Sequence, residues 1–256
     1  MYVDVELISN NTYQYSTFTY RVTDQLKDKI NVGSIVVVPF RNRDYKAIIL
    51  STSNKSLIEN PKQIKKVLNL TLNKNQIKYL QQLAISNRLN LGILLYNFVE
   101  ISVLKKQKVL NKQQINNISI KNFNDFDTKK NNVFFVPSLK IAKELYNYLS
   151  DFLYIDFYQR YGGKEELDLL KENSLRNVIL LNTNFDKLVI DNKTNYYFYD
   201  SNNTAWRLPK LNNFNVIEAA YIKNKIFGGN FNFINYFPNL EFHNEKIEVN
   251  NNFSYD

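Results

Sequence analysis

The sequence of 256 residues contains no cysteine, a single histidine, and few of the residues that interrupt regular structure, with six glycines and five prolines. Without cysteine the chain cannot form disulfides or thiolate zinc sites, and His243 has no companion ligands, so no metal site is predicted. No apolar run approaches the roughly 18 residues that a membrane-spanning helix requires. With no feature that favours secretion, these absences predict a cytoplasmic protein without a membrane partner.

The glycines are also too few and wrongly spaced for a nucleotide-binding loop. A P-loop of the form G-x-x-x-x-G-K-[ST] supplies backbone N–H groups and a lysine for the phosphates, and a hydroxyl for magnesium. No such pattern occurs in the chain. Residues 161–164 read Tyr-Gly-Gly-Lys but lack the first glycine and the following Ser or Thr, so they predict a turn before a helix. No cofactor is therefore expected.

Positive charge is in excess and is concentrated in the first half of the chain. The formal net charge is +9. Residues 1–130 contain 20 Lys and Arg against 9 Asp and Glu, a net of +11, whereas residues 131–256 contain 13 against 15, a net of −2. Concentrated cations favour a nucleic-acid partner, because their binding releases counterions from phosphates. A solvated lysine-rich surface is the alternative interpretation of this charge.

The first 70 residues have the pattern of a small β domain. Apolar and polar residues alternate over 3–7 and 17–22, which is the period of half-buried strands. Gly33 can take a positive φ at the entry to a strand, and Pro39 lacks an N–H and suits a strand end. The pattern predicts an antiparallel barrel or sandwich. Such barrels often bind single strands through a stacking aromatic and cationic side chains.

Two helices and a linker are expected next. Asn73 and Asn90 are each placed to cap a helix with apolar residues on one face, so residues 71–104 predict a helical module. Residues 105–132 are rich in Lys and Asn and show little periodicity, which predicts a linker between domains.

Residues 133–256 have an α/β pattern. Strand-like apolar runs at 133–136, 154–157, 178–181, 196–199 and 231–237 alternate with helical stretches, of which the first carries a stripe of Ile141, Leu145, Tyr148 and Leu149. Alternation of strands and helices predicts a mainly parallel sheet covered on both faces. The fold class expected is therefore α+β and multidomain: a barrel-like domain, a helical module and an α/β lobe.

The order of these segments resembles the PriA family of primosomal replication-restart helicases. The strands at 15–22 and 32–40, followed by 64–67, resemble the family's N-terminal 3′-end-binding domain, and residues 71–104 resemble its winged-helix module. Residues 133–256 resemble its first, RecA-like motor lobe. The landmarks of that lobe fall in family order at 136–139, 182–185, 199–203 and 235–241.

The resemblance implies a lobe whose chemistry is degraded. Residues 199–203 read Tyr-Asp-Ser-Asn-Asn where the family has Asp-Glu-Glu-His, so Ser201 replaces the acidic residue that orients the attacking water. With no P-loop and no second lobe in the chain, we expect a truncated protein that is not an enzyme. Trp206 and Arg207 occupy the place of a segment that links the ATP site to DNA, and we expect Trp206 to pack in the interior.

The resemblance also implies the residues of a DNA-end pocket. Phe18 matches the aromatic that stacks on the terminal base, and Lys65 matches the pocket lysine. Thr19 stands where the family has an aspartate that accepts a hydrogen bond from the 3′-hydroxyl, and Arg41 stands where it has a glycine. Arg43 and Lys66 are added as neighbouring cations, which makes the predicted DNA-binding set Phe18, Thr19, Arg41, Arg43, Lys65 and Lys66. The alternative, without the resemblance, is that Phe18 is a core residue, as an aromatic on an alternating strand more often is, that Lys65 and Lys66 are a solvated pair, and that Arg41 and Arg43 protect an edge strand.

The function expected is DNA binding at replication forks or 3′ ends during replication restart, without motor activity. Single-stranded or forked DNA is the expected partner, together with replication-restart or single-strand-binding proteins. The alternative is a non-catalytic interaction scaffold, or an RNA-binding protein, derived from a helicase. A residual nucleotide-binding enzyme is a third possibility.

Overall fold

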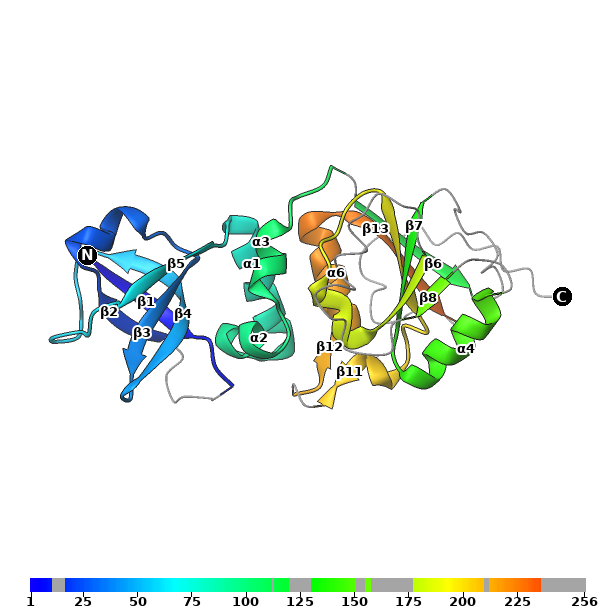
Figure 1. Cartoon of the computed structure of the whole chain (residues 1–256), viewed down its shortest axis with the longest axis horizontal. Coiled ribbons are helices and arrows are strands. Elements are labelled where there is room, and N and C mark those ends of the chain that lie inside the picture. The colour runs from blue at the N-terminus through cyan, green and yellow to red at the C-terminus, as the bar shows by residue number, and fades with distance from the viewer. Residues whose placement is uncertain are drawn as a thin grey trace. The chain divides into compact units, whose positions relative to one another are not determined.

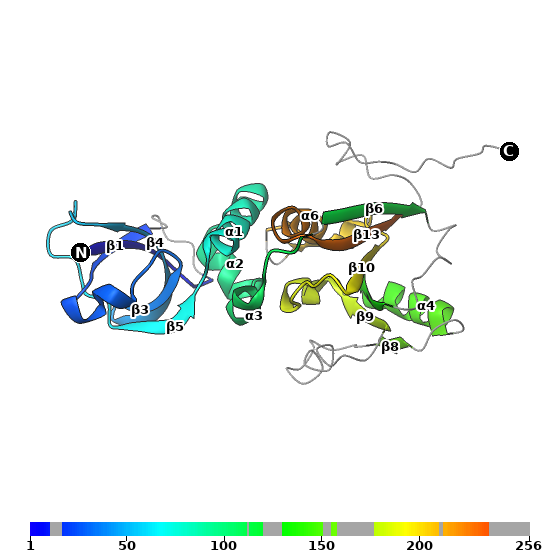
Figure 2. The same cartoon turned by 90° about the horizontal axis from the view of Figure 1, so that it is seen from above.

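The protein divides into two compact units, Met1–Gln107 and Lys108–Asp256, in a computed structural model. The structure describes residues 1–10, 17–111, 113–119, 130–150, 155–157, 177–209 and 212–235. Figures 1 and 2 show these units from two directions. Among the helices of the described residues, none is long and apolar enough to cross a membrane.

The first unit contains a five-stranded antiparallel sheet in the order β2-β1-β4-β3-β5. Its strands are β1 (Tyr2–Leu7), β2 (Thr17–Arg21), β3 (Ser34–Phe40), β4 (Arg43–Ser53) and β5 (Lys66–Thr71), with a 3₁₀ turn η1 (Asp24–Lys29) after β2. A parallel bridge joins Arg21 to Gln63, where the Arg21 N–H donates to the Lys62 carbonyl at 2.8 Å. The end of β2 thus meets the segment before β5. This near-closure confirms the predicted barrel-like domain.

The barrel interior follows from the alternation in the sequence. Val3 and Val5 of β1 are 1% and 0% exposed and belong to one apolar cluster, with Tyr20, Val36, Val38, Ala47 and Ile49 from the other strands. Residues between them, such as Asp4, leave the strand on the outer face because successive side chains alternate. The interior of the barrel is therefore one apolar core.

Three helices follow the barrel: α1 (Lys74–Asn87), α2 (Leu91–Asn97) and α3 (Ile101–Lys106). The predicted cap at Asn73 is confirmed, because its side chain accepts from the N–H groups of Asn75 and Gln76. Asn90 precedes α2 as expected, although no side-chain capping bond forms there. Residues 72–107 are all described and contain no strand, so this helical module has no wing within that range. Its winged-helix identity stays a prediction.

One close contact between the helices and the barrel lies at Gly92. A methyl group added at Gly92 of α2 would lie 1.9 Å from the Leu7 carbonyl oxygen of β1, so only glycine allows this approach. The Gly92 N–H also donates to the Glu6 carboxylate at 2.7 Å. The domain boundary predicted between residues 70 and 71 therefore falls inside one packed unit, which extends to Gln107.

The second unit is the predicted α/β lobe. Its six-stranded sheet, in the order β6-β13-β10-β7-β9-β8, is parallel throughout. The strands are β6 (Gln113–Ser119), β7 (Asn131–Val136), β8 (Ile155–Phe157), β9 (Asn177–Leu181), β10 (Thr194–Tyr199) and β13 (Gly229–Asn235). The other elements of the described residues are α4 (Leu139–Ser150), α6 (Val216–Phe227), η3 (Asn182–Lys187), η4 (Thr204–Trp206) and the short pair β11 (Arg207–Leu208) and β12 (Phe214–Asn215). The parallel sheet confirms the expected architecture.

Each face of this sheet is covered, and α4 and α6 lie on opposite sides of it (Figures 1 and 2). Beneath α4, Leu145 and Leu149 pack against Phe134 and Ile179. The stripe predicted for α4 is wrong at Tyr148, which is 47% exposed. At 100° per residue Tyr148 lies at the margin of the buried stripe, where its ring reaches solvent.

The structure differs from the linker predicted at 105–132. Residues 105–106 end α3, and β6 pairs with all seven residues of β13 in parallel register. The sequence of β6, Gln-Gln-Ile-Asn-Asn-Ile-Ser, has no period of two in its apolar residues. Its Asn116 side chain instead donates to Asn232 of β13 at 2.7 Å. A polar edge strand of this kind is recognised only once its partner is known.

That bond belongs to a row of asparagine side chains that crosses the sheet, which we call the asparagine ladder. Its members are Asn116, Asn232, Asn230, Asn195, Asn132 and Asn177, from β6, β13, β10, β7 and β9. Asn195 donates to Asn132 at 3.2 Å, and Asn132 donates to Asn177 at 2.8 Å. Asn230 completes the row by donating to Asn195. Each amide therefore satisfies its neighbour's polar group in a buried sheet.

Some sequence features lie outside the described residues. These include residues 15–16 of the first matched strand, residues 120–129 of the predicted linker, the Tyr-Gly-Gly-Lys segment at 161–164, the predicted helix at 163–170, residues 236–241 of the last family landmark, and His243.

Candidate nucleic-acid interface

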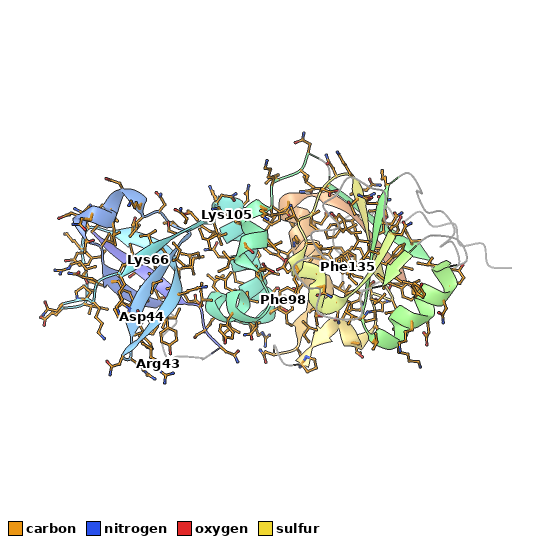
Figure 3. The ribbon with its side chains drawn as sticks, in the orientation of Figure 1. Arg43, Asp44, Lys66, Phe98, Lys105 and Phe135 are labelled. Carbon is orange, nitrogen blue, oxygen red and sulfur yellow. The ribbon has the colours of Figure 1, made fainter. Side chains whose placement is uncertain are left out.

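The β3–β4 hairpin presents cations at its turn. Arg41 and Asn42 form a two-residue loop in which both φ angles are positive, at 45° and 60°, the pattern of a type I′ turn. Arg41, Asn42 and Arg43 are exposed. Arg43 and its neighbour Asp44 lie near the end of the hairpin in Figure 3. The turn thus carries two guanidinium groups into solvent.

Three aromatic rings lie next to this turn, and we call them the aromatic cluster: Phe18 of β2, Phe40 of β3 and Tyr45 of β4. The ring centroids of Phe18 and Phe40 are 4.7 Å apart, and those of Phe40 and Tyr45 are 5.9 Å apart with the planes nearly perpendicular. The Arg41 guanidinium lies 5.4 Å from the centre of the Phe40 ring. All three rings are partly buried against the barrel core. Phe18 is therefore neither deep in the interior nor fully exposed.

Lys65 reaches the same hairpin through an ion pair. Its ammonium lies 2.7 Å from the Asp44 carboxylate, and the two side chains are 54% and 49% exposed. The Lys65 N–H donates to the Val37 carbonyl at 2.9 Å, which fixes the backbone of this residue on β3. An exposed ion pair adds little stability. The pair instead holds the Lys65 ammonium at the β3–β4 hairpin, with an acidic competitor for any phosphate.

Thr19 lies on the other face of β2. Its hydroxyl donates to Asp4 at 2.7 Å, and Ser51 donates to the second oxygen of the same carboxylate at 2.7 Å. Because neighbouring residues of a strand alternate, the side chains of Phe18 and Thr19 leave β2 on opposite faces. The structure therefore does not bring Thr19 to the aromatic cluster, and it places a carboxylate from β1 beside Thr19.

Lys66 is exposed on β5, in register with Val37 of β3, and is labelled in Figure 3. Of the six predicted residues, the structure therefore gathers Phe18 and Arg41 with Phe40, and Lys65 with the hairpin. Arg43 extends the turn and Lys66 lies further along the sheet.

Sequence reasoning missed Phe40, Tyr45 and Asp44 as members of this site. Phe40 and Tyr45 flank the hairpin turn, and the pairing of Phe40 with Arg43 brings these two segments together. Behind them Tyr20 is buried and donates its hydroxyl to the Pro39 carbonyl at 3.1 Å. Burial raises the pKa of Tyr20 to about 12, so this phenol stays neutral and keeps supporting β3. The sequence feature that could have identified Phe40 and Tyr45 is an aromatic residue on each side of a short polar turn.

The carboxyl ends of the parallel strands are the usual ligand position in an α/β sheet. There the Ser201 hydroxyl donates to Asn235 at 2.7 Å, and Asn203 donates to the Asp200 carboxylate at 2.8 Å. Trp206 is 1% exposed, and its indole donates to the Asp200 carbonyl at 2.9 Å. The predicted packing of Trp206 is confirmed. The polar groups at these strand ends bond with one another.

A comparison with known protein families finds a match for the first unit. Residues 5–98 match the model of the PriA 3′DNA-binding domain (3′BD). No curated protein matches the chain in sequence. The match includes both the barrel strands and the helices α1 and α2, in agreement with their packing into one unit. The N-terminal unit is therefore PriA-like, and the match supports DNA binding in replication restart.

Proposed function

We propose that this chain binds the 3′ ends or branches of DNA in replication restart and has no motor activity of its own. The observation that carries the proposal is the position of the aromatic cluster and its cations inside the matched domain, residues 5–98. A partly exposed ring supplies a face for a base, and flanking cations supply charge for phosphates. Both requirements meet at one hairpin.

The terminal base is the group that the aromatic cluster suits. Phe18 and Phe40 are held against the barrel core, so stacking a base on them orders no flexible side chain. Arg41 above Phe40 and Lys65 beside Asp44 then face the neighbouring phosphates. Stacking on aromatics tolerates any base. We therefore expect binding with little preference for sequence.

Preference for a free 3′-hydroxyl is a separate part of the proposal. Thr19 is bonded to Asp4 on the outer face, away from Phe18. We propose that binding requires a DNA end or a branch but depends weakly on the terminal hydroxyl. A comparison of blunt, 3′-hydroxyl, 3′-phosphate and forked DNA by calorimetry tests this. Equal affinity for 3′-hydroxyl and 3′-phosphate ends is the expected result, and strong preference for the hydroxyl contradicts it.

The α/β lobe is proposed to be a degenerate, RecA-like motor lobe retained as a scaffold. Two observations support this. No P-loop pattern occurs in the sequence, and the strand-end groups Asp200, Ser201 and Asn235 bond within the protein. ATP with magnesium is then expected to leave the thermal unfolding midpoint unchanged, since a ligand that binds the native state raises it. A rise of this midpoint with ATP would contradict the proposal and indicate nucleotide binding.

The protein is further proposed to act in the cytoplasm alongside replication-restart or single-strand-binding proteins. Competition between DNA and RNA of the same sequence separates this function from that of an RNA-binding protein derived from a helicase. DNA is expected to compete better. Tighter binding of RNA would favour the alternative.

A further inference from the structure

Helix α3 is fixed to the barrel and to α1 by contacts at its C-terminal end. The Lys105 ammonium donates to the Asn69 carbonyl of β5 at 2.8 Å. On the other side the buried Gln76 amide of α1 donates to the carbonyls of Leu104, at 2.7 Å, and Gln107, at 3.0 Å. These last carbonyls of a helix have no partner within it. The two contacts therefore dock α3 against β5 with its lysines at the end nearest that strand.

The segment around these contacts is almost free of acidic residues. Residues 60–107, the part of this segment that belongs to the first unit, contain 8 Lys and Arg and a single acidic residue, Glu100. Glu100 precedes α3 at its N-terminal end and accepts a hydrogen bond from Ser102. Four exposed cations lie on β5, immediately before it, or in the last turn of α3: Lys65, Lys66, Lys105 and Lys106. We call them the lysine track.

The lysine track leads away from the hairpin turn. On the β3 side, Lys66 pairs with Val37 and Thr71 pairs with Ser34, so β5 runs away from the turn at Arg41. Lys65 and Asn69 are four residues apart, about 13 Å at the rise of a strand. That length corresponds to about four phosphates of one strand, counted along a duplex axis. Lys105 is held at the far end by its bond to Asn69. Figure 3 labels Lys66 and Lys105 on these two elements.

We infer that a DNA strand whose end is held at the aromatic cluster extends along the lysine track, with its phosphates on β5 and then on α3. The inference rests on the proposed function and carries it further, because α3 begins after residue 98, where the family match ends. The partner is a polynucleotide backbone, since cations spaced along a strand edge contact phosphates and make no contact with bases. Anchoring by Gln76 and Asn69 means that α3 presents its charge without first being ordered.

The test compares two DNA lengths in the full chain. A 3′-ended single strand of about 2 nucleotides reaches the aromatic cluster alone, whereas one of about 12 nucleotides also covers the track. Lys106→Gln removes one exposed cation that makes no bond to Asn69. Lys105→Gln with Lys106→Gln removes both cations of α3. Lys29→Gln with Lys55→Gln is the matched control, because both are exposed lysines of the same unit outside the track.

For the longer strand, each lost phosphate contact should reduce the slope of log K against log salt by about 0.7. We expect one such step for Lys106→Gln and two for the double variant, with no change for the control or for the shorter strand. An unchanged slope in both α3 variants, while Lys65→Ala still weakens binding, overturns the track and leaves the proposed function intact. Absence of binding by the unmodified protein overturns both. Tighter binding of RNA than of DNA rejects DNA as the occupant.

Discussion

The Glu6 carboxylate of β1 accepts a hydrogen bond of 2.7 Å from the backbone N–H of Gly92, which lies 86 residues later at the start of α2. Glu6 is 7% exposed, and its burial raises the pKa of the carboxyl above its usual value, while the Gly92 bond offsets part of the rise. A charged group is thus enclosed at the contact between barrel and helices.

This burial predicts a pH-dependent stability. A folded-state pKa raised above the unfolded value of about 4.3 means that the contribution of Glu6 to stability is greatest below that pH and falls as pH rises through the folded value. Glu6→Gln keeps an acceptor for Gly92 without a charge, so it should be more stable than the unmodified protein at neutral pH. Urea unfolding at several pH values measures this.

Glu6→Leu is the control for the same position. It removes the acceptor, leaves the buried N–H of Gly92 without that partner, and should be less stable than Glu6→Gln by roughly 1–3 kcal/mol at every pH. A stability difference between Glu6→Gln and the unmodified protein that does not grow between mildly acid and neutral pH would contradict the role given to Glu6.

Asp44→Asn should strengthen DNA binding. Asp44 pairs with Lys65 at 2.7 Å, and its charge competes with phosphate for that ammonium. With the carboxylate neutral, the slope of log K against log salt should grow by about 0.7 as Lys65 gains a phosphate. Asp24→Asn provides the control, because Asp24 also pairs with a lysine, Lys27 at 2.6 Å, but on η1. Calorimetry at several salt concentrations compares them; weaker binding by Asp44→Asn would be inconsistent with the site.

Phe18→Leu separates stacking from packing. Leucine keeps an apolar contact with the barrel core but removes the ring, so DNA affinity should fall by about 1–3 kcal/mol while the protein stays folded. Leu26 is partly buried against the same core, and Leu26→Ala should lower stability without changing DNA affinity. Equal DNA affinity in Phe18→Leu and the unmodified protein would assign Phe18 to the core alone.

Asn132→Ala should destabilise the α/β lobe. Asn132 is fully buried, accepts from Asn195 at 3.2 Å and donates to Asn177 at 2.8 Å. Its loss leaves polar groups on two neighbouring strands without these partners, at a cost of roughly 1–3 kcal/mol. Asn192→Ala, at an exposed turn before β10, should be nearly neutral. Similar urea midpoints for the two variants would show that the asparagine ladder adds no stability.

The sequence predicted those elements in which local pattern and packing agree. Alternation placed Val3 and Val5 inside the barrel, and the cap at Asn73 began α1 where expected. The sequence pattern failed for elements that are stabilised by a partner strand elsewhere in the chain. The polar strand β6 is stabilised through Asn116 by an asparagine on β13, and no pattern within β6 shows this.

The candidate site shows the same limit. Phe18 and Lys65 were chosen by resemblance, and the structure places both beside the β3–β4 hairpin. Thr19 was assigned to the same pocket because it stands where the family has an aspartate, yet a strand turns adjacent side chains to opposite faces. Asp44 was missed because a surface ion pair between residues 44 and 65 depends on the register of three strands.

Trp206 is the chain's one tryptophan, and it is sealed within the second unit with its indole bonded to the Asp200 carbonyl. Intrinsic emission excited at the indole band therefore reports on the α/β lobe, while the barrel and its helices contribute only tyrosine signal. Melting of the α/β lobe can accordingly be followed by indole emission alone, without any added dye.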